Sequence, residues 1–265
     1  MTLLRIVIAA LAGGVLSTAT AAATLGLRAT WIPRLVSFAV GALLGAVFLE
    51  LLPDALERSR PAPVMLTVLI GLLAFFLLEK LVLWRHAHGH DEHSDLREET
   101  EHDHALHADH HAPQVEGRPG LMILVGNSVH SFCDGIVIAA AFIADPAIGV
   151  ATTLAIVAHA VPQQVGDFAV LLHSGFARTK AFAYNVATGV ATLVGALAAY
   201  LALADMQQAL GYVLAIAGAS LLYVAVADLI PSLHRRPEPL ETVKQMLWIG
   251  LGIAIIATTH LLLEP

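Results

Sequence analysis

The chain has 265 residues, of which 57% are hydrophobic and only 13% charged. This composition indicates an integral membrane protein. The formal net charge of −7 says little about partners, because much of it comes from one acidic loop; we expect no nucleic acid among them. The single cysteine, Cys133, excludes an intramolecular disulfide.

Apolar stretches recur along the chain, and about 20 helical residues suffice to cross a bilayer. We expect an all-α integral membrane protein with about eight transmembrane helices in a single domain, residues 1–265. They lie near residues 4–26, 34–53, 62–84, 119–143, 148–173, 180–203, 208–231 and 244–263. The first stretch also resembles a cleaved signal peptide, but it stays apolar to Leu27, which favours a retained helix.

Basic residues are unevenly divided between the two sets of connections. The loops after the first, third, fifth and seventh predicted helices hold eleven Lys and Arg residues, whereas the opposite side holds only Arg5, Arg58 and Arg60. Basic residues accumulate on the cytoplasmic side of a membrane. We therefore expect a multi-pass protein of the cell membrane with both termini outside.

One connection, residues 86–118, is long, acidic and rich in histidine. We expect this loop to be cytoplasmic and disordered, because it has too little apolar surface to fold alone. Its imidazoles and carboxylates suit transient binding of zinc or a similar divalent ion, although a plain solvated linker is the alternative. The histidines are His86, His88, His90, His93, His102, His104, His107, His110 and His111.

A short motif occurs twice in opposite orientation. ELLP at 50–53 and DLIP at 228–231 each place an acid three residues before a proline, near the end of an apolar helix. The two helices run in opposite directions across the membrane, and inverted repeats with proline-interrupted helices are typical of transporters. We expect Glu50 near the outer mouth of a pathway and Asp228 near the inner one.

The fourth and fifth predicted helices carry the main candidate site. HSFCDG places His130 and Asp134 one helical turn apart, and HAVPQQVGD repeats this spacing with His159 and Gln163. A bare carboxylate at membrane depth is costly, so it is normally paired, protonated or bound to metal. The spacing predicts one divalent ion held by these four side chains, with Asp167 as a secondary candidate.

Two other interpretations use the same residues. Asp134 could pair with a histidine only to hold two helices together. A hydrolase triad of Ser131, His130 and Asp134 is weak, because consecutive helical residues diverge by about 100°. The presence of both polar turns together with the histidine-rich loop favours metal binding.

These segments resemble the ZIP (Zrt-, Irt-like protein) family of metal transporters, and the resemblance extends over essentially the whole chain. It rests on HSFCDG, HAVPQQVGDF, the histidine-rich loop and the eight-helix plan. The resemblance implies a 3+2+3 inverted-repeat arrangement and divalent-metal transport into the cytoplasm. Zinc is the commonest substrate of such proteins, and iron, manganese or cadmium are alternatives.

The chain also departs from the family pattern. Ser131, Ala160 and Gln164 stand where the family often has a metal-binding amide or acid, and Asn127 stands at another frequent acid position. The resemblance therefore implies the first of two metal sites, and whether a second exists stays open. Gln164 remains a secondary candidate ligand.

The expected function is transport rather than catalysis, with the metal as cargo and no catalytic cofactor. A non-transporting metal sensor or receptor and an intramembrane metal-dependent hydrolase are the alternatives. The expected partners are a divalent ion and the lipid bilayer, and a homodimer is left open. The pair Gly41 and Gly45 indicates only that helices can approach closely.

Overall fold

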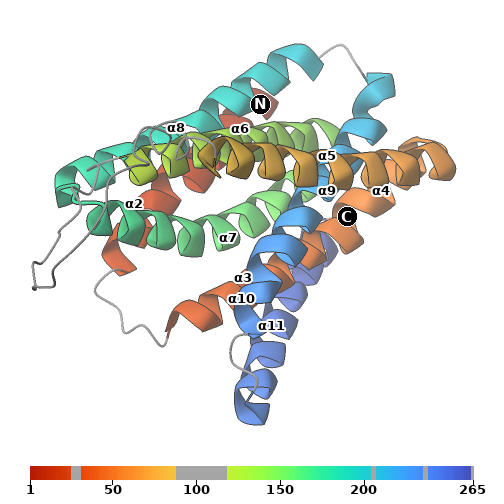
Figure 1. Cartoon of the computed structure of the whole chain (residues 1–265). Helices are drawn as coiled ribbons and strands as arrows, with labels where there is room; N and C mark the ends of the chain where they lie inside the picture. Colours follow the sequence, from red (N-terminus) through yellow and green to blue (C-terminus); the bar gives the residue numbers. More distant parts are fainter. Residues whose placement is uncertain (25–30, 88–117, 204–206, 235–237, 264–265) are drawn as a thin grey trace, which may run out of the picture.

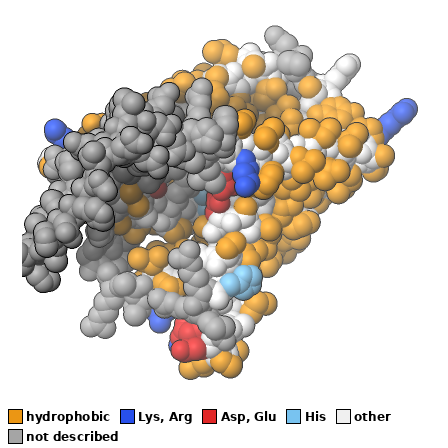
Figure 2. Space-filling model, in the orientation of Figure 1, with side chains coloured by type: hydrophobic (Ala, Val, Ile, Leu, Met, Phe, Trp, Pro, Cys, Tyr) orange, Lys and Arg blue, Asp and Glu red, His pale blue; other side chains and the backbone are white. Residues whose placement is uncertain are grey.

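A computed structural model describes residues 1–24, 31–87, 118–203, 207–234 and 238–263, and these residues form helices without any strand (Figure 1). Eight helical segments are long and apolar enough to cross a membrane. Hydrophobic side chains cover much of the surface that the described residues form in Figure 2, as a lipid-facing protein requires. The expected all-α membrane fold with eight spanning helices is confirmed.

Five of the eight spans are unbroken α-helices, and three contain a π-helical turn. The unbroken helices are α5 (Pro61–Ala87), α6 (Arg118–Ala144), α7 (Pro146–His173), α8 (Arg178–Leu203) and α11 (Pro239–Leu263). The interrupted spans are α1 (Thr2–Leu11), η1 (Ala12–Leu16) and α2 (Ser17–Thr24); α3 (Ile32–Gly45), η3 (Ala46–Leu51) and α4 (Leu52–Arg58); and α9 (Leu210–Tyr223), η6 (Val224–Leu229) and α10 (Ile230–His234), preceded by the short η5 (Gln207–Ala209).

Proline explains two of the three π-helical turns. One residue separates each π segment from the proline that follows it, Pro53 after η3 and Pro231 after η6. Each proline lacks the N–H that would continue the α-helical ladder. The residue before each proline donates to the carbonyl five positions back: Leu52 to Val47, and Ile230 to Ala225. The widened turn gives room for the proline ring, which would otherwise clash with a carbonyl of the preceding turn.

The two interrupted spans are copies of one another at a constant separation of 178 residues. The 14-residue helix α3 corresponds to the 14-residue α9, and the six-residue η3 to the six-residue η6. The same separation relates Pro61, which opens α5, to Pro239, which opens α11. Helix packing follows the same correspondence: α3 contacts α11, and its counterpart α9 contacts α5, the counterpart of α11. The inverted repeat predicted from ELLP and DLIP thus extends over the second and third spans and over the seventh and eighth.

Glycines bring the backbones of neighbouring helices into direct contact. A Cβ on Gly135 of α6 would lie 1.9 Å from the Thr192 carbonyl oxygen of α8, and one on Gly195 would lie 2.0 Å from the Phe132 carbonyl oxygen. These two contacts join α6 to α8 by backbone packing, which small residues permit in membranes. Gly41 meets α11 in the same way, so it packs within the chain.

Several helix ends meet on one face, which we call the N-terminal face. The Arg58 guanidinium donates to the Ala144 carbonyl at 3.0 Å, and Ser59 lies against Gly211. Arg5 and Asp145 line a common cavity there. The opposite face, where α5 ends and α6 begins, is called the loop face. His86 belongs to α5, whereas residues 88–117 of the histidine-rich loop lie outside the described residues.

Candidate metal site

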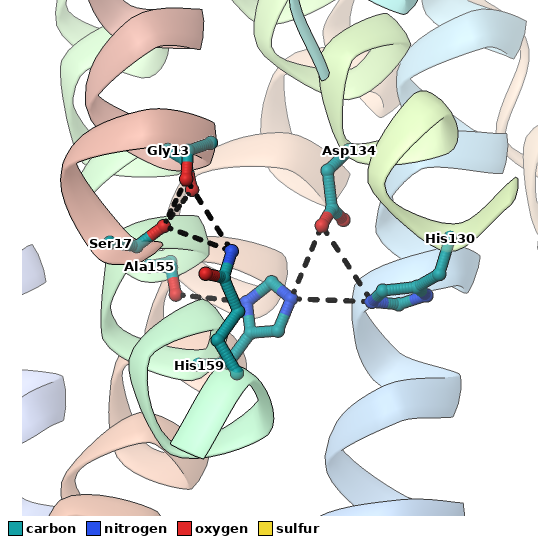
Figure 3. Close-up of polar contacts among 8 residues, drawn as sticks. Gly13, Ser17, His130, Asp134, Ala155 and His159 are labelled. Atoms are coloured by element: carbon teal, nitrogen blue, oxygen red, sulfur yellow. Dashed lines mark hydrogen bonds and ion pairs between the residues drawn. The ribbon is translucent and has the colours of Figure 1, made fainter. Parts of the chain in front are cut away.

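Three of the four predicted ligands converge between α6 and α7. The Asp134 Oδ2 atom lies 3.4 Å from His159 Nε2 and 3.7 Å from His130 Nε2, and the two imidazole nitrogens lie 3.4 Å apart (Figure 3). His130 and Asp134 share one face of α6 because four residues make roughly one turn. His159 meets them from α7, so the cluster joins two helices.

The three distances match those between ligands around a single zinc ion. Zinc bonds of about 2.0–2.2 Å in a tetrahedron separate the ligand atoms by about 3.4 Å. The three atoms Asp134 Oδ2, His130 Nε2 and His159 Nε2 thus fit three corners of a tetrahedron and leave the fourth corner open. Two imidazoles and one carboxylate suit zinc or another borderline divalent ion better than magnesium or calcium.

The cluster is enclosed unevenly. The side chains of His159 and Asp134 are 1% and 5% exposed, whereas that of His130 is 23% exposed. His159 Nδ1 lies 3.2 Å from the Ala155 carbonyl, which orients the ring so that Nε2 faces Asp134 (Figure 3). The buried carboxylate has one oxygen toward the imidazoles, while its Oδ1 has no hydrogen-bond partner among the described residues. The cluster can therefore accept a cation without rearranging its buried half.

Apolar packing closes the site toward the N-terminal face. Ile138, which follows Asp134 along α6, and Ala151 and Ile156, which precede His159 along α7, are at most 1% exposed. They belong to the main hydrophobic core of the protein. Among the described residues, this packed layer lies between the three ligand atoms and the N-terminal face.

Acidic side chains lie on the loop-face side of the cluster. Asp228 is exposed and interacts electrostatically with both histidines and with Glu79. The Tyr223 hydroxyl donates to Glu79 Oε2, which joins α9 to α5. Acids within membrane spans face the interior of the bundle or a water-filled cavity. Sequence reasoning named Asp228 but missed Glu79 and Tyr223, whose helices read as uniformly apolar.

The other candidates differ in their surroundings. Gln163 is half-buried on α7 and makes no hydrogen bond within the described part of the chain. The Gln164 amide lies 3.4 Å from both the Gly14 carbonyl and Ser17 Oγ, so it faces the first span. Asp167 is buried beside Asn127, nearer the loop face. Glu50 is 2% exposed, so it is enclosed in the protein and lines no open mouth.

Comparison with known proteins identifies the family. A profile described as "ZIP Zinc transporter" matches residues 2–260. The chain belongs to the ZIP zinc transporter family. Members of this family are transporters and not enzymes, in agreement with the sequence prediction.

Among its relatives, the chain is 30% identical over 258 residues to zinc transporter ZIP13 of Mus musculus, covering 87% of this chain and 70% of that protein. It is 29% identical over 267 residues to zinc transporter ZIP13 of Homo sapiens, covering 88% and 72%. It is 32% identical over 252 residues to zinc transporter ZIP4 of Homo sapiens, covering 77% of this chain and 39% of that protein. The ZIP family therefore assigns this membrane protein to metal-ion transport.

Proposed function

We propose that this ZIP protein carries divalent transition metals, zinc foremost, through the His130/Asp134/His159 cluster toward the loop face. The supporting observation is the set of three distances, 3.4, 3.4 and 3.7 Å, between ligand atoms inside a membrane-spanning bundle. Gln163 is the proposed fourth ligand, because it follows His159 by one turn. A site with one carboxylate binds a divalent ion while allowing its release, which conduction also requires.

The direction of transport is inferred from two independent features. The cluster is closed toward the N-terminal face by buried apolar side chains and is approached from the loop face by the exposed Asp228. The loop face also has most of the basic residues, eleven against three, which favours the cytoplasm. Both termini are then outside, and metal released past Asp228 and Glu79 enters the cytoplasm.

The inverted repeat supports alternating access. Glu50 and Asp228 occupy equivalent positions in η3 and η6, yet Glu50 is buried and Asp228 is exposed. The two copies of the repeat stand in different environments here. If each copy takes up the conformation of the other, the closed face opens and the open face closes. In the exchanged state Glu50 faces the outer mouth, as its position in the sequence suggests.

Uptake into proteoliposomes tests the proposal. The purified full chain is reconstituted, and influx of radiolabelled zinc, iron, manganese and cadmium is measured with empty liposomes as the control. We expect saturable zinc influx, reduced by the other three ions in competition. A protein that binds zinc but carries no flux is a sensor. Absence of both binding and flux in a correctly folded protein refutes the proposed site.

A further inference from the structure

The cavity lined by Arg5 and Asp145 lies between the first span and the connection from α6 to α7. It has a volume of about 590 Å³, within the range of about 300–1,000 Å³ found for small-molecule sites. Ile8 and Ala12 form one wall, Phe142 and Leu154 another, and Arg5 lies at its rim near the N-terminal face. The core cluster of metal ligands contributes no side chain to it, so the cavity is distinct from the proposed transport site.

The mouth of this cavity lies on the lipid-facing surface. Ile8 is 59% exposed and Leu154 is 40% exposed, although both line the cavity. Leu4 and Leu11, on either side of Ile8 along α1, are exposed as well. In a spanning helix such apolar side chains meet hydrocarbon. A ligand that enters between them therefore comes from the bilayer.

Two charged side chains, Arg5 and Asp145, line the cavity. Asp145 caps the start of α7, where its Oδ1 accepts from the Ala147 amide at 2.6 Å, and its negative charge also interacts electrostatically with Arg58. The Thr153 hydroxyl donates to the Gly149 carbonyl at 2.6 Å. Arg5 is exposed and forms no ion pair with any residue that the structure describes. A guanidinium offers two parallel N–H donors that suit a phosphate.

We propose that the cavity binds an anionic phospholipid of the leaflet at the N-terminal face, with one acyl chain against Ile8, Phe142 and Leu154 and the headgroup phosphate on Arg5. An uncharged ligand would leave the guanidinium unpaired, and a free phosphate would leave the apolar walls empty. The ligand that satisfies both is an amphiphile with a negative head. This assigns a lipid site to a transporter whose metal pathway lies elsewhere in the bundle.

Native mass spectrometry of the purified full chain, titrated with phosphatidylglycerol or phosphatidylcholine, tests the site. We expect Arg5→Gln to lower phosphatidylglycerol binding about fivefold, because one arginine contributes about 1 kcal/mol to binding at an anionic membrane surface. Phosphatidylcholine binding should change much less. Arg60→Gln removes an exposed arginine from the same face outside the cavity, and it should leave binding of both lipids unchanged.

A second variant tests the acyl-chain part of the site. Ala12→Phe fills the cavity from α1 and should lower binding of both lipids, whereas inorganic phosphate at millimolar concentration should displace neither. Equal loss in Arg5→Gln and Arg60→Gln would show that surface charge alone attracts the lipid. Normal lipid binding by a folded Ala12→Phe protein would show that the cavity is not the site. Displacement by inorganic phosphate would point to a free-anion site.

Discussion

Replacing Asp134 by asparagine separates metal binding from helix pairing. The substitution keeps the shape of the side chain and removes the only negative charge among the three converging ligand atoms. Breaking a buried charge pair costs about 3–5 kcal/mol when one partner is removed. At about 1.4 kcal/mol for each tenfold change, zinc affinity should fall by about 10²–10⁴-fold.

In the metal-free protein, Asp134→Asn should not lower thermal stability. Asp134 is buried, and an uncharged amide is easier to bury than a carboxylate. We therefore expect Asp134→Asn to unfold, without metal, at a temperature no lower than that of the unmodified protein. If the carboxylate served only to hold α6 against α7 through the histidines, the same substitution would lower the metal-free unfolding temperature.

Thermal unfolding with and without zinc distinguishes the two roles. At a zinc concentration 100 times its own dissociation constant, the unmodified protein gains about 2.7 kcal/mol, whereas the variant gains less than about 0.5 kcal/mol at the same zinc concentration. Glu57→Gln, which neutralises an exposed acid of α4, is the matched control and should behave like the unmodified protein. An undiminished zinc-induced shift together with undiminished zinc influx in Asp134→Asn would refute the site.

Three further variants test the second metal site, the histidine-rich loop and the packing of α6 against α8. Ser131→Asn combined with Ala160→Glu should create a second metal site about 3.5–4 Å from the first. This double variant should bind metal with higher affinity and transport it with lower maximal flux. Equilibrium binding of two core ions by the unmodified protein would contradict this expectation. Deleting residues 87–113 should leave influx intact at high metal and alter it only at low metal, because tethered ligands raise local ion concentration; complete loss of flux would place the loop in the pathway. Gly195→Leu should lower stability by about 1–3 kcal/mol through overpacking against α6, whereas Gly250→Leu, with open space around its Cβ, should be tolerated in a thermal-unfolding assay.

The convergence of His130, Asp134 and His159 was predictable because it follows from helical periodicity and the cost of burying charge. Residues four apart must share a face of α6, and a polar face inside a lipid-exposed bundle must turn toward another polar face. The sequence contains such a second face around His159. The distances were not predictable, because they depend on how closely α6 and α7 approach.

The repeat was predictable only at its prolines. ELLP and DLIP are visible because an acid and a proline keep their spacing, whereas the surrounding positions differ in identity between the copies. Backbone geometry reveals the rest: equal helix lengths and equal π-helical turns need no shared side chains, only the missing N–H of Pro53 and Pro231. An apolar composition common to nearly every span hides such correspondences from a reading of the letters.

Glu79 and Tyr223 show where sequence reasoning ends. Each lies in an apolar run, and the one polar residue three or four positions away is Ser220, three residues before Tyr223. Glu79 therefore reads as an interfacial charge and Tyr223 as a packed aromatic residue. Their contact spans 144 positions and exists because α9 packs on α5 in this fold. Once they are together, the acid, the hydroxyl and the nearby Asp228 extend polar surface from the buried histidines toward the loop face. Helix packing therefore determines on which side of the His130/Asp134/His159 cluster these polar groups lie.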